Sequence, residues 1–168
     1  VDLVETSNDK IPFEKGKEIL FEALKPLGKK YSEDLKKAFD EKWIDIYPSE
    51  GKRSGAYSWG CYDSYPYLLL NYNDTVDAVS TMGHELGHSM HSYYSKSQNY
   101  VDSNYPIFLA EIASTINEVL INDYMYRNAK TKNEKMFYSS ACSHCIPFGM
   151  RWPKWDRDTR RDSAFIEQ

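Results

Sequence analysis

The sequence predicts a mainly α fold with a small β-sheet. Two long segments, residues 73–94 and 106–128, repeat apolar side chains at the period of an amphipathic helix, about 3.6 residues. Between residues 43 and 72 the segments are short, rich in aromatic and aliphatic side chains, and separated by turns. A chain of 168 residues is long enough for one domain with a hydrophobic core.

Two shorter helices are expected before the sheet. Residues 13–24 place apolar side chains at a helical spacing, and the stretch Pro26-Leu27-Gly28 ends the pattern. Residues 32–43 predict a second helix, for which Ser32 is a candidate N-cap. Its apolar stripe is Leu35, Ala38 and Phe39.

Three strands are expected next. Residues 43–47 alternate apolar and polar side chains, and residues 56–61 and 67–72 are further candidates. Residues 50–55 form a polar turn flanked by glycine. An exposed strand edge in such a sheet can hold an extended peptide by backbone hydrogen bonds. The alternative is a hairpin that only supports the helix after it.

The helix predicted over residues 73–94 carries the most informative motif. Asn73 or Asp74 is its candidate cap. His84, His88 and His91 are spaced so that they share one face. The neighbouring stripe is apolar and is expected to be buried: Val76, Val79, Met82, Leu86 and Met90.

His84-Glu85-Leu86-Gly87-His88 is an HExxH motif. Two neutral imidazoles one helical turn apart can bind one Zn²⁺, and Glu85 between them can deprotonate a bound water. The alternative is a chance match on a polar helix. Gly87 either keeps the helix narrow between the ligands or allows the next helix to pack closely.

A catalytic zinc needs a third protein ligand. The metzincin pattern would place glycine at position 91 and histidine at position 94, but these are His91 and Tyr94, so that class is rejected. Glu111 in the helix of residues 106–128 is the next candidate, because a carboxylate in so apolar a run needs a partner if it is buried. Alternatively Glu111 faces solvent or pairs with a Lys or Arg. Glu118, seven residues on, either orients a ligand histidine or is a surface residue.

Four stretches together resemble oligoendopeptidase F, in the thimet oligopeptidase family of zinc peptidases: HELGHSMHSYYS, YPIFLAEIASTINEVL, GKRSGAYSWG and YPYLLLNYN. The resemblance implies a zincin-like HExxH core within a larger helical peptidase fold. It implies one Zn²⁺ per chain held by His84, His88 and Glu111, with Glu85 as general base. It also implies short peptides as substrates and the edge-strand role for part of residues 55–59.

The resemblance covers about residues 13–127, and members of the family are several times longer. We therefore expect residues 1–134 to be a partial catalytic domain whose partners are short peptides and the remainder of the peptidase. Residues 135–168 do not resemble the family and are expected to be a divergent tail, either disordered or read from another frame. Cys142 and Cys145 have C-x-x-C spacing, which fits a redox or metal site but also two reduced thiols.

Composition narrows the function classes. The net charge of -4 gives no indication of a nucleic-acid partner. No apolar run reaches the roughly 18 residues of a membrane span, and the mean hydropathy is -0.68, so no membrane partner is expected and a cytoplasmic location is favoured. Two rival functions remain open: an inactive zinc-binding fragment of such a peptidase, and, less favoured by the ligand types, a structural zinc module.

Overall fold

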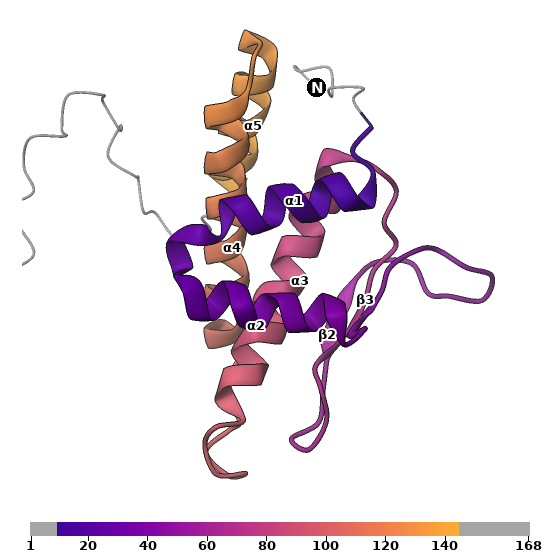
Figure 1. Cartoon of the computed structure of the whole chain (residues 1–168), viewed down its shortest axis with the longest axis vertical. Coiled ribbons are helices and arrows are strands. Elements are labelled where there is room, and N and C mark those ends of the chain that lie inside the picture. Colours follow the sequence, from indigo (N-terminus) through magenta and orange to yellow (C-terminus); the bar gives the residue numbers. More distant parts are fainter. Residues whose placement is uncertain (1–9, 145–168) are drawn as a thin grey trace, which may run out of the picture.

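The computed structural model describes residues 10–144, with side chains from residue 10 to residue 138. Helices α1 and α2 both run across a central helix α3, with a small sheet on one side of α3 and α4 on the other (Figure 1). The predicted fold class, mainly α with a small sheet, is confirmed. The elements are α1 (Phe13–Ala23), a 3₁₀ turn (Lys25–Leu27), α2 (Lys29–Asp40), β1 (Ile44–Asp45), β2 (Tyr57–Trp59), β3 (Tyr67–Leu69), α3 (Val76–Ser95), α4 (Ile107–Asn128) and α5 (Lys132–His144).

Helix α2 begins three residues before the predicted start. Gly28 is its N-cap and has a φ of 97°, a left-handed conformation that glycine adopts without strain. The Ser32 hydroxyl lies one turn further on and donates to the Gly28 carbonyl oxygen at 3.2 Å. The prediction of Ser32 as the cap is therefore wrong, because the glycine turns the chain directly into the helix.

The sheet has the strand order β1-β3-β2, with β1 parallel and β2 antiparallel to β3. The strands contain only two or three residues and are shorter than predicted. Hydrogen bonding continues past the end of β3, since the amides of Leu70 and Tyr72 donate to the carbonyls of Asp45 and Ile46 at 2.8 and 2.9 Å. Strand β2 lies at one edge of this sheet.

Helix α3 is capped by Thr75, whose hydroxyl accepts a hydrogen bond from the Ala78 amide at 3.1 Å. Asn73 accepts from the Thr75 hydroxyl at 2.8 Å and thus supports the cap indirectly. The predicted caps Asn73 and Asp74 are wrong. Asp74 has a φ of 60°, which belongs to the turn before the helix rather than to a cap.

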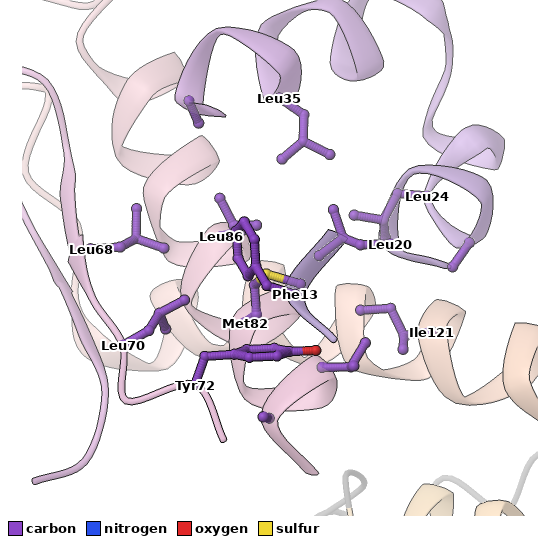
Figure 2. Packing of buried hydrophobic residues seen from close by; sticks show 14 of the residues in the cluster. Phe13, Leu20, Leu24, Leu35, Leu68, Leu70, Tyr72, Met82, Leu86 and Ile121 are labelled. Atoms are coloured by element: carbon purple, nitrogen blue, oxygen red, sulfur yellow. The ribbon is translucent and has the colours of Figure 1, made fainter. Parts of the chain in front are cut away.

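The hydrophobic core surrounds α3 (Figure 2). The apolar stripe predicted for this helix is confirmed at Val79, Met82, Leu86 and Met90, which are all 1% exposed or less, whereas Val76 is only partly buried. The stripe packs against α1, α2, β3 and the segment of residues 70–72 that follows β3. Core side chains from those elements include Leu20, Leu24, Leu35, Leu68, Leu70 and Tyr72.

Helix α5 runs across residue 134, the expected end of the partial catalytic domain, and that boundary remains a prediction. Cys142 lies in α5, but its side chain is outside the described set, and Cys145 lies outside the described residues altogether. Of the helices in residues 10–144, none is both long enough and apolar enough to cross a bilayer.

Candidate metal centre

The site is formed where α3 crosses α4, and Gly87 allows the two backbones to approach. A β-carbon at position 87 would lie 2.6 Å from Ser114 Cα and 2.8 Å from the Ala113 carbonyl oxygen. Those distances are shorter than van der Waals contact, so only glycine fits there without moving α4. Of the two interpretations of Gly87, a narrow helix between the ligands or close packing of the next helix, the structure supports the close packing of α4.

This crossing brings His84, His88 and Glu111 together. The two histidine Nε2 atoms are 3.0 Å apart, and Glu111 Oε2 lies 3.6 Å from the first and 3.7 Å from the second. One donor atom from each residue falls within 4.8 Å of the other two. The histidines come from α3, one turn apart, and the carboxylate comes from α4.

The donor set fits a tetrahedral cation. Zinc–ligand bonds of about 2.0–2.1 Å at tetrahedral angles separate the ligand atoms by roughly 3.4 Å. The three distances of 3.0, 3.6 and 3.7 Å lie on both sides of that value. Two imidazoles and one carboxylate also leave a fourth position open, unlike the closed, cysteine-rich sites of structural zinc modules.

Further contacts orient both histidines. Glu118 Oε1 lies 2.5 Å from His84 Nδ1, and this hydrogen bond raises the pKa of His84 above its ordinary value. Hydrogen bonding to a carboxylate assigns the proton of neutral His84 to Nδ1, which leaves the Nε2 lone pair directed at the cluster. His88 donates to the Ala110 backbone carbonyl, but burial has the larger effect and lowers the pKa of His88. Glu118 was expected either to orient a ligand histidine or to be a surface residue, and its contact with His84 supports the first interpretation.

Glu85 lies beside the cluster on the buried side of α3, with 8% of its surface exposed. Burial raises the pKa of the Glu85 carboxyl, partly countered by the charge of His84 and by a hydrogen bond from the Ser58 backbone amide. Ser58 belongs to β2, and its hydroxyl shares a hydrogen bond of 2.7 Å with that of Ser89 on α3. The strand and the motif helix are therefore joined at Glu85.

Glu111 is more exposed than its apolar neighbours in the sequence indicate. Its side chain is 49% exposed, and Phe108 and Ile112 beside it are 65% and 53% exposed. The expectation that the apolar residues around Glu111 are buried is wrong, because that face of α4 is exposed. The carboxylate nevertheless points to the histidines, and the Ser114 hydroxyl donates to Glu111 Oε2 at 3.0 Å.

His91, the third histidine of the predicted face, does not belong to the cluster. Its ring stacks on Tyr105 with centroids 3.9 Å apart, and the Tyr105 hydroxyl shares a hydrogen bond of 2.6 Å with Ser92. These contacts tie the loop before α4 to the end of α3. Burial lowers the pKa of His91.

Three contacts at the site were missed by sequence reasoning: the Ala110 carbonyl, the Ser58 amide and the Ser114 hydroxyl. The first two are backbone groups, which carry no residue signature. Ser114 follows Glu111 by three positions and so lies on the same helix face, which was an available signal.

A sequence profile of Peptidase family M3 matches residues 3–143. The chain belongs to Peptidase family M3. Among M3 relatives, Oligopeptidase PepF of Bacillus subtilis is 41% identical over 136 residues, which are 80% of this chain and 20% of PepF. Group B oligopeptidase PepB of Streptococcus agalactiae is 48% identical over 110 residues, covering 65% of this chain and 18% of PepB. The chain thus spans about a fifth of the length of the curated relatives it matches.

Two solved structures share this fold. A Chlamydophila abortus protein assigned as a peptidase superposes with a TM-score of 0.80 at 46% identity, covering 84% of this chain and 24% of that protein. PZ peptidase A, solved with an inhibitor, superposes with a TM-score of 0.60 at 19% identity, covering 84% of this chain and 25% of its own, and supports the fold alone.

Proposed function

We propose that this chain is the metal-bearing part of a zinc metallopeptidase that hydrolyses short oligopeptides. The observation that carries the proposal is the convergence of His84, His88 and Glu111, with Nε2 and Oε2 atoms 3.0–3.7 Å apart, beside the buried Glu85. Membership of Peptidase family M3 supports the peptidase activity. Oligopeptides as the substrate class follow the names of the relatives.

In the proposed reaction His84, His88 and Glu111 hold one Zn²⁺. Zinc at that position would supply Lewis-acid polarisation of the scissile carbonyl and a lowered pKa for water. Glu85 acts as the general base, accepting a proton from the attacking water on a carboxylate oxygen and returning it to the leaving amine nitrogen. Burial raises the pKa of Glu85 and so brings it closer to neutral pH. A pKa near the working pH suits a group that must both accept and release a proton.

We propose that the substrate lies as an additional strand along β2. The amide of Ser58 bonds to Glu85 and its hydroxyl bonds to Ser89, so the strand is fixed next to the general base. A peptide paired by backbone hydrogen bonds would be held with little dependence on its side chains. Tyr57 and Trp59 on either side of Ser58 are 51% and 74% exposed and would contact such a peptide.

The rival proposal is a zinc-binding fragment without activity. It is favoured by the outward face of α4, where Phe108, Ile112 and Ile116 are 65%, 53% and 46% exposed although they repeat at helical spacing. An exposed apolar face of this kind is typical of a surface that another element or chain covers. Since the chain spans about a fifth of its relatives, we propose the remainder of an M3 peptidase as the partner that covers this face.

We also propose a cytoplasmic location for this activity. The mean hydropathy of -0.68 supports it, and three cysteines are too few for the disulfide framework of a small secreted domain.

Cleavage of a quenched fluorescent peptide tests the proposal. The purified chain should hydrolyse the peptide with a kcat/KM far below that of intact B. subtilis PepF, because the outward face of α4 and the site are open to water, which weakens electrostatic stabilisation. The Glu85→Gln variant is the control for contaminating peptidases. Zinc binding without any cleavage above that control would favour the inactive zinc-binding fragment. A kcat/KM equal to that of PepF would contradict the idea that the site is incomplete in this chain.

A further inference from the structure

Asn117 links three helices through one side chain. It lies on the face of α4 that crosses α3 and is 1% exposed. Its amide nitrogen donates to the Gly83 carbonyl oxygen of α3 at 3.0 Å, and its amide oxygen accepts from the Tyr31 hydroxyl of α2 at 3.1 Å. Both ends of the side chain are therefore paired with different elements.

The position of these bonds relates them to the metal centre. Gly83 directly precedes His84, and Asn117 directly precedes Glu118, which bonds to His84 Nδ1. Two hydrogen bonds from adjacent residues of α4 thus reach adjacent residues of α3. Together they fix both the separation and the relative rotation of the two helices at the first ligand histidine.

We propose that Asn117, supported by Tyr31, is a positioning residue for the metal centre. It holds the α3–α4 crossing in the register that brings the Glu111 carboxylate to the two Nε2 atoms. The proposal rests on the proposed zinc site, because this register matters for function only if the three residues bind a metal together. Its contribution is geometric, since both polar atoms of its side chain are already bonded to Gly83 and Tyr31.

An amide suits this position for a chemical reason. The Gly83 carbonyl needs a donor and the Tyr31 hydroxyl needs an acceptor, and an amide offers both in a short side chain. Leucine has a similar shape but would leave both partners without Asn117, at a site where water has little access. Tyr31→Phe removes only the α2 link and keeps the bond from Asn117 to α3.

The test compares zinc affinity and ligand geometry in matched variants. Asn117→Leu and Tyr31→Phe are titrated with Zn²⁺ against a chromophoric chelator, and the visible bands of bound Co²⁺ report the coordination geometry. The control is Tyr72→Phe, which also removes one buried tyrosine hydroxyl bond, to the Ile11 carbonyl at 2.9 Å, but one that does not involve α4. Thermal unfolding of the metal-free proteins measures stability separately.

Asn117→Leu is expected to weaken zinc binding on the order of 10- to 100-fold, as loss of groups that orient ligands does, and to alter the Co²⁺ bands. Tyr31→Phe should have a smaller effect in the same direction, and Tyr72→Phe should lower thermal stability while leaving affinity and bands unchanged. If Asn117→Leu and Tyr31→Phe bind Zn²⁺ like the parent, the positioning role is wrong while the zinc site stands. If the parent chain itself binds no Zn²⁺, the proposed function fails and the positioning role with it.

Discussion

Substituting alanine for Gly87 should damage the proposed metal centre without removing any of its proposed ligands. The added methyl group would lie 2.6 Å from Ser114 Cα, 2.8 Å from the Ala113 carbonyl oxygen and 2.9 Å from the Ser114 amide nitrogen. All three are backbone atoms, so no rotamer change relieves the clash. Carbon–carbon contact is comfortable at about 3.5–4.0 Å, so α4 must move by about 1 Å.

A shift of that size matters because Glu111 is carried by α4. Its carboxylate oxygen lies 3.6 and 3.7 Å from the two histidine nitrogens, and a movement of about 1 Å takes it out of bonding range of a shared cation. We expect zinc affinity to fall on the order of 10- to 100-fold. Overpacking costs about 1–3 kcal/mol of folding free energy, offset by up to about 1 kcal/mol from replacing glycine within a helix.

Zinc titration and thermal unfolding of the metal-free chain measure these two effects separately. Gly83→Ala is the comparison, since a β-carbon there would meet the end of the Ile121 side chain, which can rotate away. It should weaken zinc binding much less than Gly87→Ala. Equal zinc affinity in Gly87→Ala and the parent would refute the idea that the close crossing sets the ligand distances.

Three further predictions follow from individual contacts. Glu85→Gln should keep zinc binding but abolish peptide cleavage, because an amide cannot accept the proton of water; retained cleavage would remove Glu85 as general base. Glu118→Gln should weaken zinc binding on the order of 10-fold by loosening His84, and an unchanged dissociation constant would contradict that role. The third concerns acid stability. Burial would raise the pKa of Asp34, but hydrogen bonds from Lys30, Lys37 and Tyr94 outweigh it and hold the pKa at about 2, below the ordinary 3.8. A lowered carboxyl pKa stabilises the fold above pH 3.8 and loses that contribution as the pH falls toward 2, so the parent should lose at most about 2 kcal/mol over this range. Asp34→Asn should lack that step in acid unfolding curves, and identical curves would contradict the assignment.

The sequence was sufficient for the parts of the site that depend on helix period. His84 and His88 share a face because they are four residues apart, and the helix containing Glu111 is marked by its own apolar period. The orientation of Glu118 could not be predicted, because a residue seven positions from Glu111 faces a histidine only if α3 and α4 cross at Gly87. That crossing depends on a contact between residues 87 and 114, which no local pattern records.

Local backbone geometry explains the remaining differences. Gly28 takes a positive φ and moves the start of α2 forward, and Thr75 caps α3 because the chain turns at Asp74. The lengths of the strands were overestimated because the ends of a strand depend on pairing with its neighbours. The bonds of Ser58 and Ala110 at the site come from the backbone, so residue identity could not have shown them.

Metal stoichiometry is the most direct test of the proposed site. The purified chain, freed of metal and dialysed against Zn²⁺, should retain about one zinc per molecule by atomic emission. His84→Ala, His88→Ala and Glu111→Ala should each lose it, while Asp123→Ala, a change to an acidic side chain of the same α4 helix whose carboxylate pairs with Arg127, should retain it. Full retention of zinc in Glu111→Ala would contradict the three-residue site, and no zinc in the parent chain would contradict the metal centre itself.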